Sequence, residues 1–256
     1  MDLPPACEPP ALVVVAGQSN ALGYTLGRSD LPPHLQTPVP DAWIWNPLRK
    51  GFEPLAPGSN TGAPNNPQAW GPEAQFAWRW RAAHPCAPLY VVKHARGDTG
   101  LAADPAARDW SISSRGELFD AASTEVSAAK AALAARGAPV RVSAVLWMQG
   151  EKDATDRAKG DAYETNLRAF IARVRARWGD AQTVFEIGRI DDLGDGYPGA
   201  GAVRRAQARV AATSEHVTLT DTDAFPRQPS DGLHLTAKAQ VALGDGFFEA
   251  GRKVAP

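Results

Sequence analysis

Short apolar runs alternate with helical patterns along this chain, and the alternation leaves few folds open. Five runs are rich in β-branched residues and end at Gly or polar residues, at 11–16, 89–94, 141–147, 183–187 and 216–219. Such runs are typical of buried strands. The segments between them predict helices at 72–83, 117–136, 163–178, 202–212 and 237–251. Strands alternating with helices form parallel βαβ units, so the sequence predicts an α/β sandwich around a parallel sheet.

Residues 21–70 depart from this alternation. The stretch is rich in Pro, Gly and Asn, with a possible short strand at 43–45 and no convincing helix. A loop of this length inside a compact domain is usually functional or a lid. No linker, repeat or low-complexity segment marks a second domain. Residues 1–256 are therefore expected to form a single domain with a long loop insertion at about 21–70.

The charge balance argues against polyanionic partners. The chain has 27 basic and 28 acidic residues and a formal net charge of -1, so no global field attracts nucleic acid or an anionic membrane. The one basic cluster, 168–177, lies on a helical pattern and is interpreted as a solvated helix face. No apolar stretch reaches the ~20 residues of a membrane span, and residues 1–10 lack the blocks of a signal peptide. An enzyme or a binding module remains.

Polar, glycine-containing segments follow four of the predicted elements. In open α/β sheets, ligands bind at the carboxyl ends of the strands. Three segments directly follow strands, and one lies beyond the fifth strand. They are Gly17-Gln18-Ser19-Asn20, residues 95–100, residues 148–153 and residues 230–235. The topology brings all four to one edge of the sheet.

Together these segments contain the parts of an acyl-transfer site. Ser19 is the candidate nucleophile, and its hydroxyl needs an adjacent base. His234 is the candidate base, and Asp231 could fix the tautomer of its ring and stabilise the imidazolium. The expected oxyanion donors are the backbone N–H of Ser19, a backbone N–H near Gly97 and the side-chain amide of Gln149.

Each motif also has an ordinary structural interpretation. Ser19-Asn20 could be a turn or helix cap, and Asp231-Gly232 is a common turn dipeptide. The segment from Gly97 to Gly100 could be a simple turn, and Gln149 with its neighbours could cap the next segment. Their shared position at the strand ends is what favours a catalytic site.

The same residues carry a family resemblance that covers nearly the whole chain, from residue 12 to about 245. The sequence resembles the SGNH (GDSL-type) hydrolase superfamily, within it the branch of carbohydrate acetylesterases and sialate O-acetylesterases. The matching motifs are Gly17 to Asn20, Trp147-x-Gln149-Gly150-Glu151-x-Asp153, Asp231-Gly232-x-His234, Gly71 to Glu73 and Val203 to Gln207. The resemblance implies a three-layer α/β/α fold with a five-stranded parallel sheet of order 2-1-3-4-5, and no metal or other cofactor.

One departure from that family concerns the second segment. The family usually has Gly-Gly-Thr where this chain has Gly97-Asp98-Thr99. A backbone N–H survives the change, but a carboxylate beside an oxyanion is unfavourable unless it points away or pairs with Arg96.

Other residues receive supporting roles or alternatives. Gly17, Gln18 and Asn20 are expected to support the nucleophile, and Glu151 and Asp153 to hold the loop that presents Gln149 rather than to form an acid/base pair. The histidines outside the site lack ligand-like spacing, so no metal site is predicted. Four tryptophans in loops that lead to the sheet edge could stack on a sugar or could pack the insertion: Trp43, Trp45, Trp70 and Trp110.

These features predict a serine esterase that removes acetyl groups from an acetylated carbohydrate. Two alternatives stay open: a lipid or thioester acyl hydrolase with the same machinery, and a non-catalytic carbohydrate-binding module. The sequence leaves the sugar and the oligomeric state undetermined. Cys7 and Cys86 precede the first two strand ends at similar distances, so a disulfide between them is expected against the alternative of two free thiols. A bridge would favour an extracytoplasmic location, and a cytoplasmic one stays possible.

Overall fold

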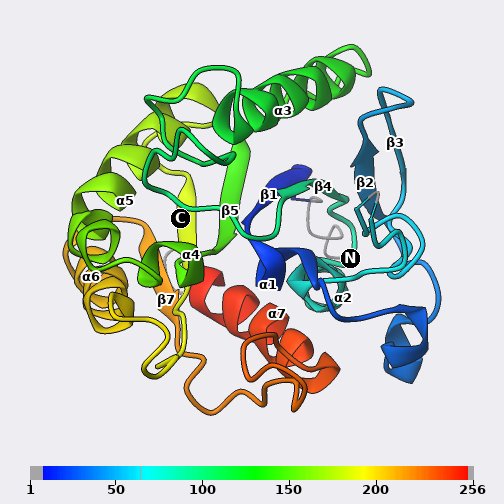
Figure 1. The fold of residues 1–256 in the computed structure, drawn as a ribbon. Helices are drawn as coiled ribbons and strands as arrows, with labels where there is room; N and C mark the ends of the chain where they lie inside the picture. Colours follow the sequence, from blue (N-terminus) through cyan, green and yellow to red (C-terminus); the bar gives the residue numbers. More distant parts are fainter. Residues whose placement is uncertain (1–7, 64, 253–256) are drawn as a thin grey trace.

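A seven-stranded sheet forms the centre of the computed structural model, which describes residues 8–63 and 65–252 (Figure 1). The strand order is β3-β2-β4-β1-β5-β6-β7, and only β3 runs antiparallel to its neighbour. The strands are β1 (Ala11–Gly17), β2 (Ala42–Asn46), β3 (Gly51–Pro54), β4 (Leu89–Ala95), β5 (Val142–Met148), β6 (Val184–Gly188) and β7 (Val217–Thr220).

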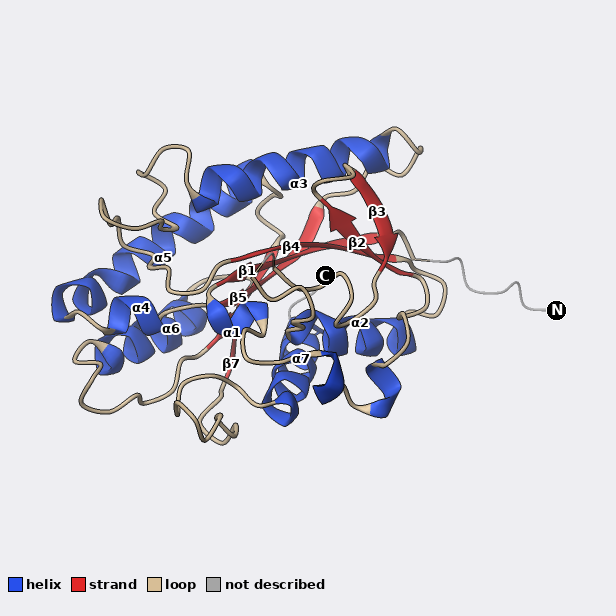
Figure 2. Ribbon diagram, turned by 45° about the vertical axis from the view of Figure 1, so that its right-hand side comes forward, coloured by secondary structure: helices blue, strands red, loops and turns tan. Residues whose placement is uncertain are grey.

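Helices cover both faces of this sheet (Figure 2). α2 and α7 lie on one face, and α3 and α5 lie on the other with α6 packed against α5. The helices are α1 (Ser19–Leu22), α2 (Pro72–Ala83), α3 (Leu118–Ala134), α4 (Glu151–Ala154), α5 (Arg157–Arg177), α6 (Ala200–Thr213) and α7 (Ala237–Arg252), with two short 3-10 turns at Arg28–Asp30 and Pro33–Leu35.

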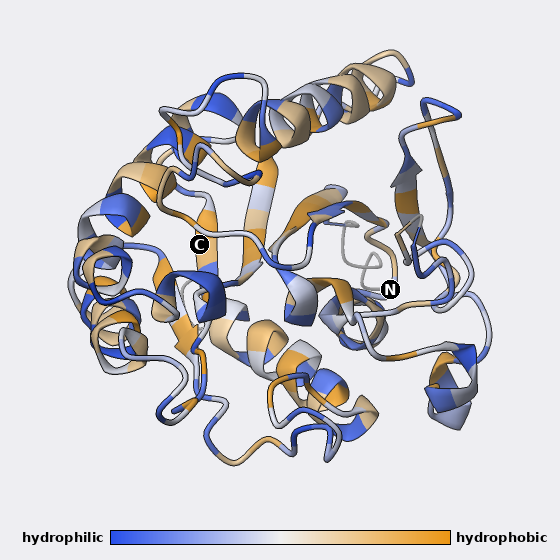
Figure 3. Cartoon of the chain, viewed as in Figure 1, coloured by the Kyte–Doolittle hydropathy of each residue, from blue (hydrophilic) through white to orange (hydrophobic). Residues whose placement is uncertain are grey.

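The apolar strand residues lie between these two helix layers (Figure 3). Every residue of β1 is buried, because the strand is central and is covered on both faces. Trp147 of β5 packs against Phe170 of α5 on one side, with ring centroids 4.6 Å apart. On the other side, Phe76 of α2 meets Phe248 of α7.

The predicted α/β sandwich is confirmed, but the predicted number of strands is wrong. The five predicted strands are present in the order β4-β1-β5-β6-β7, which is the expected 2-1-3-4-5. The insertion adds β2 and β3, a hairpin that extends the sheet beyond β4. Residues 43–45 suggested the first of these strands. The sequence Gly-Phe-Glu-Pro of β3 has no apolar run, and its residues are largely half-exposed.

The insertion is anchored on the domain by a small core and a buried ion pair. Leu26, Leu31, Leu35, Trp70 and Ala74 form a separate apolar cluster. Beside it, the ammonium group of Lys93 on β4 donates to Glu73 Oε1 at 2.8 Å and to two carbonyl groups of the insertion. Burial lowers the pKa of Lys93, while the carboxylate of Glu73 opposes that shift.

A cavity of about 990 Å³ lies at the amino ends of the strands. Val13, Ala144 and Glu186 line it from the sheet, and Trp80 and Phe248 line it from α2 and α7. Glu8 and Arg252, the two ends of the described chain, lie at the same cavity.

Candidate active site

The carboxyl ends of β1, β4 and β5 meet at one point of the sheet edge. Gly17 pairs with Ala95 on one side and with Met148 on the other. The turns that follow these strands therefore lie next to each other. They line a cavity of about 700 Å³ to which the segment before α7 adds His234. Residues from all four predicted segments thus come together, with Ser19, Gly97, Glu151 and His234 in the cavity wall.

The tight turn after β1 places Ser19 at the cavity. Gly17 has φ +137°, and a Cβ atom there would lie 2.1 Å from the carbonyl oxygen of Met148. Only glycine fits this close approach of two backbones. The chain then enters α1 at Ser19, whose backbone N–H is in the first turn, where helices leave such groups unpaired.

Asp231 and His234 form the pair that the sequence predicted. His234 Nδ1 lies 2.8 Å from Asp231 Oδ2, and Asp231 Oδ1 accepts the backbone N–H groups of Leu233 and His234. Burial raises the pKa of Asp231, but the hydrogen bonds from His234 and from these N–H groups outweigh it and hold that pKa below its usual value. Asp231 is therefore a carboxylate at neutral pH.

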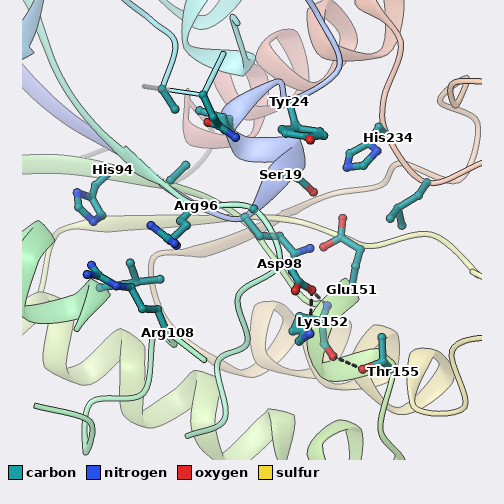
Figure 4. Close-up of a pocket in the computed structure, with 18 of the residues that line it drawn as sticks. Ser19, Tyr24, His94, Arg96, Asp98, Arg108, Glu151, Lys152, Thr155 and His234 are labelled. Carbon is teal, nitrogen blue, oxygen red and sulfur yellow. Dashed lines mark hydrogen bonds and ion pairs between the residues drawn. The ribbon is translucent and has the colours of Figure 1, made fainter. Parts of the chain in front are cut away.

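Ser19 and His234 both line the cavity, and the ring of Tyr24 lies next to that of His234 (Figure 4). The ring centroids of Tyr24 and His234 are 5.4 Å apart. Within the described residues, the Ser19 hydroxyl makes no hydrogen bond to the imidazole. Such bonds are often long in unliganded enzymes and shorten when substrate binds.

Gly97 lies beside Ser19, as the predicted oxyanion loop requires. A Cβ atom on Gly97 would lie 3.7 Å from the Ser19 Cβ. The carboxylate of Asp98 does not pair with Arg96. It forms a 2.8 Å ion pair with Lys152 of α4 (Figure 4), which neutralises its charge.

The structure corrects the role expected of Gln149. Its side chain is fully buried, outside the lining of the cavity, and its amide nitrogen donates to Thr99 O at 3.1 Å and to Asp153 Oδ2 at 2.7 Å. The amide is thus committed to the interior and is not available to an oxyanion. The sequence pattern identified the right loop but could not show which way the side chain points.

Gln18 is the side-chain amide that lines the cavity instead. Its oxygen accepts the backbone N–H groups of Gly150 and Lys152, at 3.4 and 3.2 Å, and the Gln149 amide at 3.3 Å. Because the oxygen is held by these donors, the Gln18 Nε2 group is the end left without a partner among the described residues.

Glu151 and Asp153 hold the neighbouring loops, as expected of supporting residues. Asp153 accepts the backbone N–H groups of Leu101 and Ala102 at 2.7 and 2.8 Å. Glu151 Oε1 accepts the Asn20 amide at 2.8 Å. Burial raises the pKa of both carboxyl groups.

None of the four tryptophans lines the cavity, which favours the packing alternative over sugar binding. Trp70 and Trp110 are fully buried, Trp45 is nearly so, and Trp43 lies on β2. Tyr24 and Tyr197 are the aromatic residues of the cavity wall. Neither was predicted from the sequence, although Tyr24 lies five residues after the candidate nucleophile and Tyr197 lies in the loop after β6.

Two arginines in the cavity have no carboxylate partner. Arg96 and Arg108 are exposed and make no side-chain ion pair among the described residues, whereas the adjacent His94 contacts Glu125 at 3.1 Å. Both arginines project into the part of the cavity away from His234 (Figure 4). Both residues lie in the long loop between β4 and α3, and their spacing in the sequence does not show that both face the cavity.

Two further features concern other classes of site. Among residues 8–63 and 65–252, no group of His, Cys, Asp or Glu side chains could hold a metal ion, and no helix is long and apolar enough to cross a membrane. Cys7 lies outside the described residues, so its disulfide with the exposed Cys86 stays a prediction.

Comparisons with known proteins agree with this architecture. A family model described as "Carbohydrate esterase, sialic acid-specific acetylesterase" matches residues 9–253. A probable carbohydrate esterase of Arabidopsis thaliana is 32% identical over 110 residues, which is 43% of this chain and 40% of that protein. The chain thus aligns with less than half the length of that curated relative.

Solved structures show the same fold. An Arabidopsis thaliana protein superposes with a TM-score of 0.75 at 20% identity, covering 97% of this chain and 100% of that one. A carbohydrate acetylesterase of Xanthomonas citri has a TM-score of 0.65 at 18% identity, covering 96% and 56%. With the match over residues 9–253, the chain belongs to the carbohydrate esterase family of sialic acid-specific acetylesterases.

Proposed function

We propose that this chain is a serine esterase that removes O-acetyl groups from a carbohydrate through an acyl-enzyme on Ser19. The observation that carries the proposal is the Asp231–His234 pair next to Ser19 at the wall of the cavity. Family membership and the acetylesterase fold support the same reaction class.

The reaction begins with attack of Ser19 Oγ on the acetyl carbonyl carbon while His234 Nε2 takes the hydroxyl proton. Asp231 holds the ring by Nδ1 and stabilises the imidazolium. The tetrahedral oxyanion is bound by the backbone N–H groups of Ser19 and Gly97 and by the free amide of Gln18. Each such donor contributes a factor of about 10²–10³ in turnover.

Collapse of the tetrahedral intermediate breaks the bond to the sugar oxygen, which receives the proton from His234. Water then enters, His234 takes one of its protons, and the hydroxide attacks the acetyl-Ser19 carbonyl. A second collapse releases acetate and returns the proton to Ser19.

A chromogenic acetyl ester tests the proposal directly. Ser19→Ala is expected to lower kcat by at least about 10³-fold, because the nucleophile is lost while the fold remains. Ser113→Ala, which changes an exposed serine outside the lining of the cavity, is the matched control and should retain wild-type turnover. Equal activity of wild type and Ser19→Ala would contradict the proposal.

The cavity also favours a sugar with a negative charge. Arg96 and Arg108 offer two unpaired guanidinium groups that suit a carboxylate. The family description names sialic acid, a sugar that carries a carboxylate. We therefore propose an acetylated acidic sugar as the substrate class.

Paired substrates separate charge recognition from catalysis. Arg96→Gln and Arg108→Gln should each raise KM for an acetylated acidic sugar about tenfold and leave the neutral acetyl ester unchanged. Arg173→Gln, an exposed change on α5, serves as the control. An equal effect of the Arg96 and Arg108 variants on both substrates would rule out a charge-recognition role.

Two alternative functions predict different results: the first uses the same catalytic residues on another substrate, and the second uses no catalytic residue. A lipid or thioester hydrolase would prefer acyl chains of eight carbons or more in a chain-length series. A non-catalytic sugar-binding module would fail to label at Ser19 with a serine-reactive phosphonate.

A further inference from the structure

Asn20, the residue after the candidate nucleophile, connects three segments of the site. Its side chain is buried, and its amide nitrogen donates to Glu151 Oε1 at 2.8 Å and to Leu233 O at 3.3 Å. Its amide oxygen accepts the backbone N–H of Leu235 at 2.9 Å. Asn20 therefore bonds to the backbone on both sides of His234.

The segment that carries His234 has few other polar contacts with the turn that carries Ser19. Residues 221–236 contain no regular helix or strand, and Asp231 and Gly232 are exposed. The other polar contact between the two is a 3.3 Å hydrogen bond from Gln228 to Thr25 at the surface. The ring of Tyr24 adds an aromatic contact with His234 itself. The buried polar contacts are all made by Asn20, whose backbone oxygen also accepts the amide of Gln240 on α7 at 2.7 Å.

Glu151 fixes which end of the Asn20 amide faces which partner. A carboxylate only accepts hydrogen bonds, so the Asn20 nitrogen must face Glu151 Oε1. The oxygen is then left for Leu235 N–H. The three hydrogen bonds of the Asn20 side chain can therefore form in one orientation of its amide only.

We propose that Asn20 is a positioning residue that sets the place of His234 relative to Ser19, with Glu151 orienting the Asn20 amide. The proposal rests on the function proposed above. It assigns Asn20 no contact with the substrate. Its effect is on the distance and angle between the hydroxyl and the imidazole, on which proton transfer depends steeply.

The decisive variant is Asn20→Asp, which keeps the size of the side chain. The introduced carboxylate still accepts Leu235 N–H, but its second oxygen faces two acceptors, Leu233 O and Glu151 Oε1. With 4-nitrophenyl acetate, we expect N20D to lower kcat about 100-fold and to change KM less than threefold. Ser19→Ala, assayed in parallel, shows whether the serine mechanism itself holds.

A donor–acceptor swap tests the pairing with Glu151. In the double variant N20D/E151Q, the introduced amide can donate to the introduced carboxylate, which restores one lost bond in reversed polarity. We expect kcat of the double variant to exceed that of N20D about tenfold, with E151Q alone measured to close the cycle.

Asn60 provides a matched control in the insertion. Its amide nitrogen likewise donates to a glutamate, Glu53, and to a backbone carbonyl, and its oxygen accepts a backbone N–H. N60D should lower the unfolding midpoint without lowering kcat. The proposal is overturned if N20D keeps wild-type kcat, or if N20D and N60D lose activity equally. It is also overturned if the double variant N20D/E151Q has no higher kcat than N20D. If instead Ser19→Ala remains active, the proposed function is what fails.

Discussion

Glu186 is an acidic residue whose carboxyl group finds no hydrogen-bond donor among the described residues. It lies on β6 beneath α7, and its Oε2 is buried without a partner. Burial alone raises the pKa of Glu186 well above the ordinary value. The folded protein therefore binds a proton at this residue under conditions where the unfolded chain has lost it.

The sign of the pH effect follows from that difference. Because the folded pKa is raised, the folded state binds more protons than the unfolded chain above the ordinary pKa of about 4.5, and stability falls as pH rises through this range. Glu186→Gln removes the titration. We expect it to stabilise the protein at pH 8 by about 1 kcal/mol or more, with the difference shrinking towards pH 4.5.

Urea unfolding at several pH values measures this effect. Glu215→Gln, a change at an exposed position, should leave the pH dependence as it is in wild type. A Glu186→Gln protein that loses stability between pH 5 and 8 as steeply as wild type would contradict the prediction.

At the scale of single residues, the sequence could not predict which of two similar side chains faces the cavity. Asp231 and His234 are three residues apart, so local geometry was enough to pair them. Gln149 and Gln18 are both amides at strand ends, and only the tertiary structure shows that the first is committed to Asp153 and Thr99. The same holds for Trp110, whose ring is buried against Trp147 rather than facing a sugar.

At the scale of elements, the turn between β1 and α1 is a tightly constrained piece of backbone in the site. Gly17 combines a positive φ with a backbone contact that leaves no room for a side chain. The hydrogen bond from Gln18 N–H to Met148 O, at 2.9 Å, ties the turn to the end of β5. The position of Ser19 thus depends on the packing of two neighbouring strands.

Gly17→Ala should displace this turn. The added Cβ would lie 2.1 Å from the Met148 carbonyl oxygen, so β1 and β5 would have to separate. We expect a loss of about 3 kcal/mol or more in the free energy of unfolding, and turnover of an acetyl ester below a hundredth of wild type in whatever protein still folds.

Gly194→Ala isolates the backbone conformation from the contact. Gly194 also has positive φ, +71°, but a Cβ there would meet no atom within 4 Å. It should cost only about 1 kcal/mol and leave turnover unchanged. Similar losses in the two variants would show that the close approach at Gly17 is not decisive.

Elements buried on both faces were predictable, and those at the edge were less so. The runs of β1 and β5 are almost wholly apolar because helices cover both faces of these strands. β3 packs at the sheet edge and has no such run. α5 begins at Arg157, earlier than the apolar pattern from Tyr163 predicted, because the Asp156 side chain caps it by accepting Lys159 N–H.

At the scale of the whole molecule, a nearly neutral protein carries a locally positive cavity. The formal net charge of -1 gives no long-range attraction for an anion. In the cavity wall, the Lys152–Asp98 pair cancels and Glu151 interacts with His234, whereas Arg96 and Arg108 have no ion-pair partner among the described residues. Recognition of an acidic sugar would thus be a short-range effect of two arginines.

Ionic strength should therefore separate two kinds of substrate. Raising NaCl from 20 mM to 500 mM should lower kcat/KM severalfold for an acetylated acidic sugar, because salt screens exposed charges. The value for a neutral acetyl ester should change little. Initial rates across a salt series measure both, and identical salt profiles would argue against charge-based recognition.

The cavity at the amino ends of the strands bears on how this protein could be attached to something else. Glu8 and Arg252 lie there together, on the edge of the sheet opposite Ser19. A label or a fused domain attached at Glu8 or Arg252 would therefore lie at the edge of the sheet opposite Ser19, and would leave the cavity at Ser19 open to a large ligand.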